Sequence, residues 1–256
     1  MNTFYNDTNK FAILARTYNI LLYSKKLKIL VGDLLGAEDA QSMTKYELHS
    51  AINKALIDNY SGESSIKAFL VKEFLAKNVV ASFEIRVKNS RVDFLTINGE
   101  TTSFEIKSEL DNLQKLSRQT ENYSRVFEYN YIVIDRKHLA RADAIIPDNY
   151  GIWIYSNNKK QVFRKAKKNL VLDNRMQLQL LTKKELQKAF SETDQEVIFE
   201  NQSQESINLF FKQCLKERYS FRWEYLKMHQ QSIFPIDYQF FFNKNISPSI
   251  IYQGSL

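Results

Sequence analysis

Two acidic residues and a lysine lie close together in a stretch of short β-forming segments. Asp93 occurs in RVDFLTI, and Glu105 and Lys107 occur in the next such segment, TSFEIKS. Successive residues of a strand point to opposite faces, so Glu105 and Lys107 share one face while Phe104 and Ile106 share the other. Charged side chains among large apolar neighbours are costly to bury unless their charge is compensated. A bound divalent metal ion would supply that compensation.

The turn between these two segments decides whether the carboxylates meet. A two-residue turn at Asn98–Gly99 would pair Asp93 with Phe104 and place Asp93 on the wrong face. A three-residue connection over 98–100 pairs Asp93 with Glu105 instead, because a shift of one residue moves every side chain to the other face. The sequence therefore predicts an odd-length turn or a bulge here, with both carboxylates around one cation.

These residue types suit phosphodiester hydrolysis. Asp93, Glu105 and the backbone carbonyl of Ile106 can supply three hard oxygen ligands to Mg²⁺, with water and a phosphate oxygen at the remaining positions. Such an ion lowers the pKa of a bound water and neutralises charge on the pentavalent phosphate. Lys107 can orient or deprotonate the attacking water and stabilise the growing negative charge. We expect Mg²⁺ as the cofactor, with Mn²⁺ as a substitute.

The surrounding elements predict an α/β fold with a mixed central sheet flanked by helices. Apolar residues at three- and four-residue spacing predict helices over 10–35, 44–60 and 64–77, and Thr44 and Glu47 have the spacing of a capping box. β-rich segments and turn residues predict an antiparallel meander. Its strands are expected at 79–87, 91–97 and 102–108. The elements expected next are a helix over 111–128, a strand at 129–135, a helix over 137–145 and a strand at 151–156, with a turn at Lys159–Lys160.

The last third of the chain differs in character. LTKKELQKAF and SINLFFKQCLKERYSFRWEYLKMHQQ indicate helices, and the tail SIFPIDYQFFFNKNISPSIIY is aromatic-rich and is expected to be irregular. The segment 191–203 is the expected domain edge. We therefore predict an N-terminal helical extension (1–40), a core (41–192) and a C-terminal helical and aromatic region (193–256).

The motif continues into the helix after the meander. Asp93, a gap of about a dozen residues, Glu105-x-Lys107 and then Gln119-x-x-x-Tyr123 resemble the PD-(D/E)XK nuclease superfamily, particularly its RecB-like branch. The resemblance implies a restriction-endonuclease-like core with helical additions at both ends. It also implies a deoxyribonuclease site in which these five residues hold metal, serve the attacking water and support both.

The resemblance points to two further acidic residues. In the superfamily an acidic residue on the helix before the meander often joins the site, and Glu47 in KYELHSAINKAL is the best match. Glu84, in FEIRV on the first expected strand, is the second candidate. Both are expected as additional metal ligands.

A longer stretch, SRVDFLTINGETTSFEIKSELDNLQKLSRQTENYSRVFEYNYIVID, resembles a group of small, poorly characterised bacterial proteins of this superfamily. Their pattern EIKSDxDxLxRLxxQxxxYxxVF is followed by a histidine and an Ile-Pro-x-x-x-Gly-Ile stretch. This chain has His138 and residues 146–152 in the corresponding places. The resemblance covers about residues 44–190. Val92 stands where a proline often precedes the first aspartate.

Plainer interpretations of the same residues remain open. Glu105 and Lys107 could be a surface ion pair on an edge strand, and Gln119 and Tyr123 could serve helix packing alone. Glu47 could only cap its helix. Asp111 is expected to cap the helix that follows it.

Basic and aromatic residues elsewhere also have two interpretations. The run at 164–168 and the pair Lys183–Lys184 could track phosphates or form a solvated face. Bases and aromatics that interleave in the C-terminal helix could stack single-stranded nucleobases or pack a helix face. These residues are Arg218, Tyr219, Phe221, Arg222, Trp223 and Tyr225.

Composition narrows the functional classes. The net charge of +7 and pI near 9.2 suit a polyanionic partner, expected to be DNA. Cys214 is the single cysteine, so an internal disulfide is excluded and a reducing cytoplasm is expected. No signal-peptide pattern and no membrane-spanning apolar run occur; a phosphate-binding loop and a G-x-S-x-G motif are also absent.

Two alternatives to a free nuclease remain at this stage. One is a binding module on the same fold that grips nucleic acid or protein without cutting. The other is a nuclease subunit that is active only within a larger complex, joined to a protein partner or a second copy through the C-terminal region.

Overall fold

The computed structural model describes residues 3–156 and 159–253, which form two compact units. Unit 2 comprises Phe74–Trp223, and unit 1 comprises Met1–Glu73 together with Glu224–Leu256. Two helices, α5 (Glu63–Leu75) and α11 (Gln204–His229), have residues in both units. The predicted division after residues 40 and 192 rests on sequence pattern and stays a prediction.

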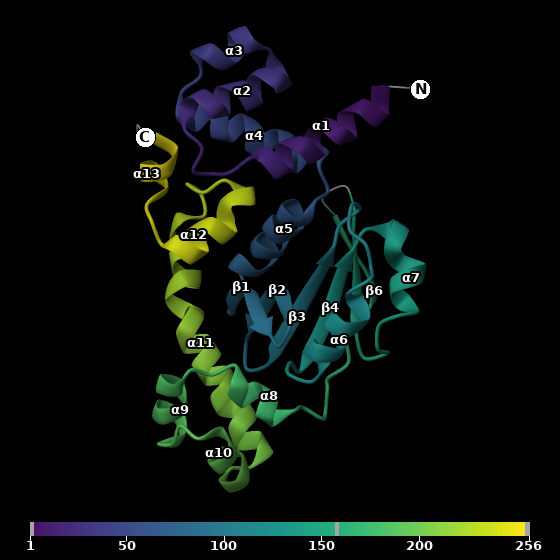
Figure 1. The fold of residues 1–256 in the computed structure, drawn as a ribbon, viewed down its shortest axis with the longest axis vertical. Coiled ribbons are helices and arrows are strands. Elements are labelled where there is room, and N and C mark those ends of the chain that lie inside the picture. The colour runs from purple at the N-terminus through teal and green to yellow at the C-terminus, as the bar shows by residue number, and fades with distance from the viewer. Residues whose placement is uncertain (1–2, 157–158, 254–256) are drawn as a thin grey trace. The chain divides into compact units, whose positions relative to one another are not determined.

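Unit 2 is built on a six-stranded mixed sheet, drawn as arrows in Figure 1. The strands are β1 (Val80–Val87), β2 (Ser90–Ile97), β3 (Thr101–Lys107), β4 (Tyr129–Ile134), β5 (Gly151–Ser156) and β6 (Lys159–Arg164). They lie in sequence order across the sheet. The first three form the predicted antiparallel meander, β3, β4 and β5 are parallel, and β6 returns antiparallel to β5. The predicted α/β class with a mixed central sheet is therefore confirmed.

The two faces of β3 have different characters, as its alternation predicts. Phe104 packs with aromatic rings on one face; these are Phe74, Phe94, Tyr131 and Trp153. Glu105 and Lys107 lie on the other face, where they bond to each other. Residue 104 thus holds the strand in the apolar core while its neighbours present charge to the opposite side.

Helix α6 (Leu116–Ser124) covers the charged face and packs against β2 and β4. Its buried residues Leu116 and Tyr123 join two apolar clusters, one with Ile132 and Ile134 of β4 and the other with Leu95 of β2. A short connection of η1 (Arg136–His138) and α7 (Leu139–Asp143) leads from β4 to β5. The helices α8 (Asn174–Gln179), α9 (Lys183–Phe190), α10 (Gln195–Asn201) and the first part of α11 extend the cluster around Tyr123.

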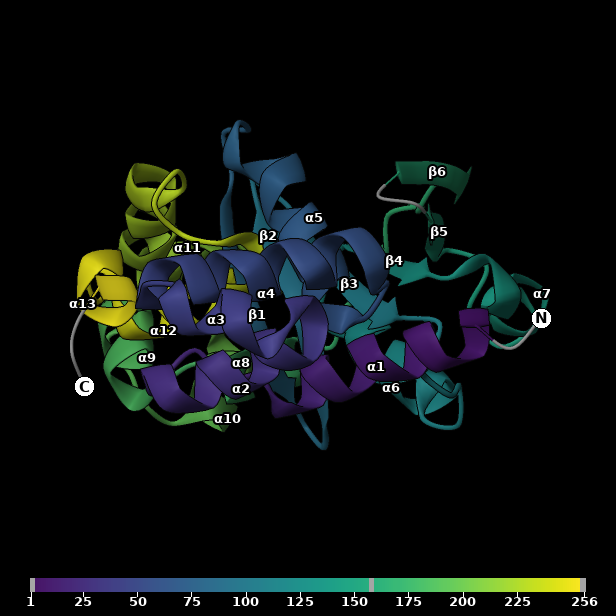
Figure 2. The same cartoon turned by 90° about the horizontal axis from the view of Figure 1, so that it is seen from above.

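Unit 1 is helical in its described residues. From the N-terminal segment it contains α1 (Thr3–Thr17), α2 (Ser24–Leu35), α3 (Ala37–Ser42), α4 (Lys45–Asn59) and most of α5. From the C-terminal segment it contains η2 (Pro235–Asp237), α12 (Tyr238–Lys244) and α13 (Pro248–Gln253). Figure 2 shows α1, α2, α3 and α4 side by side, and Leu27, Val31, Leu48 and Ile52 form their fully buried core. The predicted capping box is present, since Thr44 and Glu47 close the first turn of α4 reciprocally. None of the described helices is long and apolar enough to cross a membrane.

Three sequence expectations about local structure are wrong. The helix expected from residue 111 begins at Leu116, and Asp111, which was expected to cap it, bonds to Ser108 instead. Lys159 and Lys160 belong to β6, not to a turn, and the Lys160 ammonium lies over the Trp153 ring at 4.2 Å. The tail expected to be irregular contains α12 and α13.

The aromatic residues of that tail explain its helicity. Tyr238, Phe241 and Phe242 recur at three- and four-residue spacing and are all buried, which is the pattern of an amphipathic helix face.

Candidate functional site

The connection between β2 and β3 has three residues, as predicted. Asn98 donates its amide to the carbonyl of Glu100 at 2.9 Å, and Gly99 adopts a φ of 69°, a left-handed value that favours glycine. The ladder pairs Phe94 with Phe104. Asp93 therefore follows the last pair on the side that carries Glu105.

Beyond this pair, a hydrogen bond from a side chain takes the place of the backbone hydrogen bonds between β2 and β3. The carboxylate Oδ2 of Asp93 accepts a hydrogen bond from the backbone amide of Ile106 at 2.6 Å. This bond fixes the carboxylate against β3, immediately after Glu105. The half-buried carboxylate is thereby oriented by the backbone itself.

Glu84 lies opposite Asp93 on the neighbouring strand β1. The ladder pairs on either side are Phe83–Phe94 and Ile85–Val92. A carboxylate oxygen of Glu84 lies within 4.8 Å of one of Asp93, and Arg91 forms an ion pair with Glu84 at 3.2 Å. Glu84, Asp93 and Glu105 thus occupy one row across β1, β2 and β3.

The backbone of Glu84 is strained. Its φ of 57° is unusual for a residue other than glycine within a strand. Phe83 packs against Phe94, whereas Ile85, two residues later, belongs to the cluster around Tyr123. Residues two apart share a face in a regular strand, so the strained residue marks a local break in the alternation. Strain of this kind costs about 1–3 kcal/mol and tends to persist at functional sites.

Glu105 and Lys107 form a buried ion pair. Glu105 is 0% exposed and Lys107 is 9% exposed. The lysine Nζ donates to Oε1 of Glu105, and the side chains of Tyr123 and Gln119 also lie close enough to the carboxylate to lower its pKa. The interpretation as a solvated surface pair is thereby excluded, because both side chains are out of solvent.

Burial and charge act together on this pair. Burial raises the pKa of Glu105 above its ordinary value, although the Lys107 ammonium opposes that rise. Burial alone would lower the pKa of Lys107, but the carboxylates of Glu105, Asp93 and Asp111 raise it. Lys107 is therefore held as a cation beside three carboxylates.

Gln119 and Tyr123 lie on the face of α6 that meets this site. Tyr123 is fully buried and donates its hydroxyl to the carbonyl of Arg91 at 2.8 Å. Burial and the nearby carboxylate of Glu105 raise the pKa of Tyr123. The buried Oε1 of Gln119 has no partner within the described part of the chain. Tyr123 thus ties α6 to β2 beside Asp93, which confirms its packing role; a catalytic role for Gln119 and Tyr123 stays a prediction.

Glu47 closes the capping box of α4. Its Oε2 accepts from the amide and the hydroxyl of Thr44, both at 2.7 Å, and these bonds lower the pKa of Glu47. It belongs to unit 1, whereas Asp93 and Glu105 belong to unit 2. Its capping role is confirmed, and a role at a metal stays a prediction.

The donor set of unit 2 suits a hard divalent cation. The set consists of the carboxylates of Asp93, of Glu84 within 4.8 Å of it, and of Glu105 on the next strand. A buried carboxylate such as that of Glu105 is costly to keep ionised, and burial raises its pKa. A bound cation would remove that cost, so the residues present fit Mg²⁺.

Three residues near Lys107 were not among the predicted site residues. Asp111 contributes to the charge around Lys107, and its Oδ2 accepts from the Ser108 amide at 2.7 Å. The buried His138 places its Nε2 3.0 Å from the carbonyl of Ser108. The signal for them lay in the pattern EIKSDxDxL and the histidine that follows it, which this chain matches at Ser108, Asp111 and His138.

The basic runs divide between structural and solvated roles. Arg164 bonds to the carbonyl of Tyr150 at 2.7 Å and to Asp143 at 2.9 Å, so it is a structural residue. Lys168 pairs with Glu100 at 2.5 Å. Lys165 and Lys167 are exposed.

In α11 the interleaved aromatics serve mainly the core. Trp223 is 0% exposed and Tyr225 is 9% exposed. Arg218 is bonded to Glu185 at 2.7 Å, whereas Phe221 is 69% exposed. Base stacking by Trp223 is excluded by its burial.

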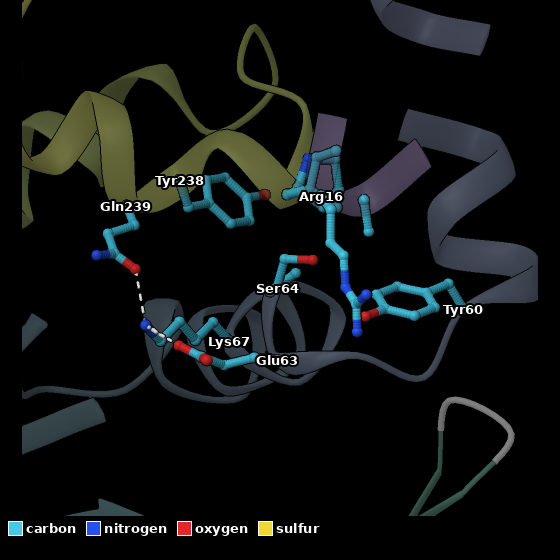
Figure 3. A pocket seen from close by; sticks show the side chains of 11 residues that line it. Arg16, Tyr60, Glu63, Ser64, Lys67, Tyr238 and Gln239 are labelled. Carbon is cyan, nitrogen blue, oxygen red and sulfur yellow. Dashed lines mark hydrogen bonds and ion pairs between the residues drawn. The ribbon is translucent and has the colours of Figure 1, made fainter. Parts of the chain in front are cut away.

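A separate cavity of about 260 Å³ lies within unit 1 (Figure 3). Its buried Lys67 bridges Glu63 at 2.6 Å and Gln239 at 2.9 Å, and Arg16 and Tyr60 lie across the cavity from them. None of the predicted site residues lines it.

Comparisons with known proteins give a family for this chain. A comparison with curated proteins finds no match. Among solved structures, a protein of unknown function from Silicibacter pomeroyi, SPO1766, is similar at 17% identity and a TM-score of 0.34, over 43% of this chain and 75% of that protein. Residues 56–241, well over half of the chain, match the family described as bacteriophage P4 protein cII. The chain belongs to the bacteriophage P4 protein cII family.

Proposed function

We propose that this chain is a metal-dependent nuclease that hydrolyses phosphodiester bonds in DNA. The observation that carries the proposal is the row of Glu84, Asp93 and Glu105 across three adjacent strands, with Lys107 held against Glu105. The burial of this pair adds to it, because taking both charges out of water has a desolvation cost that a bound cation would offset. The Asp, Glu-x-Lys and Gln-x-x-x-Tyr pattern of the PD-(D/E)XK superfamily falls on these same residues.

Asp93, Glu105 and Glu84 would hold Mg²⁺, or Mn²⁺ in its place, with the carbonyl of Ile106 as the further predicted ligand. When bound, the ion supplies a lowered pKa for a coordinated water and positive charge opposite the phosphate. The proposal includes a cytoplasmic location, expected from the single cysteine.

The protein's own groups have distinct tasks in this proposal. The Ile106 amide orients Asp93, and Oε1 of Glu105 fixes the ammonium of Lys107. A lysine held as a cation donates hydrogen bonds, so Lys107 would orient the attacking water and stabilise charge on the phosphate oxygens. Gln119 would complete the site from α6, and Tyr123 would keep that helix in place through Arg91.

The test is cleavage of supercoiled plasmid and of labelled single-stranded DNA in Mg²⁺, Mn²⁺ or EDTA. Wild type, Asp93→Asn and Lys107→Ala would be compared, with Lys165→Ala as an exposed lysine control. We expect metal-dependent cutting that is retained by Lys165→Ala and lost by the other two variants.

Wild-type protein that cuts in no metal would overturn the proposal. If that protein still binds DNA, the non-cleaving module or the partner-dependent subunit would take its place. Cutting that survives both site substitutions would move the active site elsewhere.

A further inference from the structure

A groove of about 500 Å³ runs beside the candidate site in unit 2. It is lined by β1, α8 and α11. The partly buried Leu180 and Tyr219 present apolar surface to it. They lie over the core residues Ile85 and Met176, which are 5% and 3% exposed. The groove therefore offers an apolar surface at its base.

The edge of the groove is cationic. Arg86 and Lys88, near the turn between β1 and β2, are both exposed and line it. Arg218 lines it from α11, where bonds to Glu185 at 2.7 Å and to the Leu180 carbonyl at 3.0 Å fix the guanidinium. An apolar floor with a cationic edge matches a ligand that carries both flat apolar groups and regularly spaced anions.

One end of the groove reaches the row of carboxylates. Glu84 itself lines the groove, and its carboxylate lies within 4.8 Å of that of Asp93. A polyanion bound along Arg86 and Lys88 would thus have its backbone directed to the residues that the proposed function makes metal ligands.

We propose that this groove binds a single strand of nucleic acid, with an unstacked base against the partly buried Leu180 and Tyr219 and the flanking phosphates at Arg86 and Lys88. The inference rests on the proposed function for its biological meaning and names the substrate class of that site. A duplex keeps its bases stacked inside and presents phosphates and groove edges, so it would leave the apolar floor uncovered. Single-strand binders combine cationic grooves with surfaces on which bases stack.

Gln179 allows a test at one exposed position on the groove. Gln179→Glu and Gln179→Lys change charge with little change in size, and the side chain is exposed, so neither should affect folding. Fluorescence anisotropy with labelled oligothymidine of about 12 nucleotides, in EDTA, measures binding without cleavage. We expect Kd to rise roughly fivefold for Glu and to fall roughly fivefold for Lys, as for one contact of about 1 kcal/mol.

The matched control is Gln202, an exposed glutamine at the end of α10 that lies outside the groove. Gln202→Glu and Gln202→Lys alter net charge equally and should leave Kd within about twofold, because exposed charges beyond a Debye length are screened. If substitutions at Gln179 and Gln202 change Kd equally, the oligonucleotide is attracted by net charge alone and the groove assignment is wrong.

A second variant removes the cations. Arg86→Ala combined with Lys88→Ala should reduce the slope of log Kd against log salt by about 1.4, as expected for two phosphate contacts with a single strand. Lys165→Ala with Lys167→Ala removes the same charge elsewhere and should keep the slope. Circular dichroism would confirm folding of each variant.

The two proposals fail in different ways. If oligothymidine binds tightly in the groove but is cleaved in no metal, the groove proposal stands and the nuclease proposal is wrong. If DNA is cut in a metal-dependent way but binding is unchanged in every groove variant, the nuclease proposal stands and the groove proposal is wrong. Tighter binding to a duplex than to a single strand of equal length would also contradict the groove proposal.

Discussion

Oδ2 of Asp93 and the backbone amide of Ile106 lie 2.6 Å apart, where the ladder between β2 and β3 ends. One carboxylate thus satisfies a buried backbone donor of β3 and also lies in the row of candidate metal ligands. Its structural and chemical tasks can be separated by substitution.

Asp93→Asn should separate them. The amide oxygen of asparagine can still accept from Ile106, so the free energy of unfolding should stay within about 1 kcal/mol of wild type. The proposed metal-binding charge is lost, and cleavage should fall by a factor of 100 or more. Asp93→Ala should lose the same activity and, because the Ile106 amide is left unpaired, about 1–3 kcal/mol of stability. Urea unfolding and plasmid cleavage measure the two; equal stability of both variants would contradict the role of this hydrogen bond.

The pair Glu105 and Lys107 should behave non-additively. Lys107→Met leaves the buried carboxylate without its cation and should cost about 3–5 kcal/mol, as for other broken buried pairs. Glu105→Gln with Lys107→Met removes both charges and should recover much of that stability. Cleavage should be absent from both variants. A double variant no more stable than Lys107→Met would show that the ion pair is not what the single substitution disturbs.

Substitutions of Glu84 should affect stability and Mg²⁺ binding in different ways. Glu84→Gly relieves the φ of 57° and should leave stability unchanged or raise it by about 1 kcal/mol, since glycine adopts this conformation readily. Glu84→Ala keeps the strain and should not gain. Both remove a carboxylate near Asp93, so both should weaken Mg²⁺ binding, measured by calorimetry. Identical stability of the two variants would argue against strain, and unchanged Mg²⁺ affinity would remove Glu84 from the ligand set.

A buried hydrogen-bond network in unit 1 contains two groups whose effects on the pH dependence of stability should oppose each other. Burial raises the pKa of Asp237 to about 7, and its carboxylate accepts from Tyr252 at 2.9 Å and from Tyr18 at 3.2 Å. Tyr18 also lies 2.8 Å from Nδ1 of His49, and burial lowers the pKa of His49 to about 4, with Lys45 adding to the shift. Asn53 faces the same carboxylate at 3.4 Å.

The two shifts act in opposite directions between pH 4 and 7. The folded state holds the Asp237 proton more tightly than the unfolded state, so this group adds stability as pH falls, on the order of 4 kcal/mol in total. The unfolded state protonates His49 more readily, so that group removes stability as pH falls from about 6.5 to 4, on the order of 3 kcal/mol. The wild-type contributions should therefore largely cancel.

Single substitutions should expose each slope. Asp237→Asn should lose stability when the pH falls from 7 to 4, and His49→Asn should gain stability over the same range. Chemical unfolding at several pH values measures both. If the free energy of unfolding changes with pH in the same way in both variants, the opposing pKa shifts assigned to Asp237 and His49 are wrong.

Local pattern was sufficient for five of the six strands, all but β6, and for part of the site. Alternation of Phe104, Glu105, Ile106 and Lys107 fixed their faces, because the side-chain period of a strand leaves no other arrangement. The turn at Asn98–Gly99 could be given its odd length because only that length puts Asp93 on the side of Glu105. The capping box at Thr44 is likewise a local device, determined by a spacing of three residues.

Tertiary structure decided what depends on contacts distant in sequence. The strained backbone at Glu84 is one example, because Phe83 packs against Phe94 while Ile85 enters the cluster around Tyr123. The tail became helical because Tyr238, Phe241 and Phe242 had a core to enter. Burial separated Trp223 and Phe221, neighbours in one helix that sequence could not distinguish. A sequence specifies which residues are near along the chain, whereas burial and the closeness of charges depend on which distant segments fold against them.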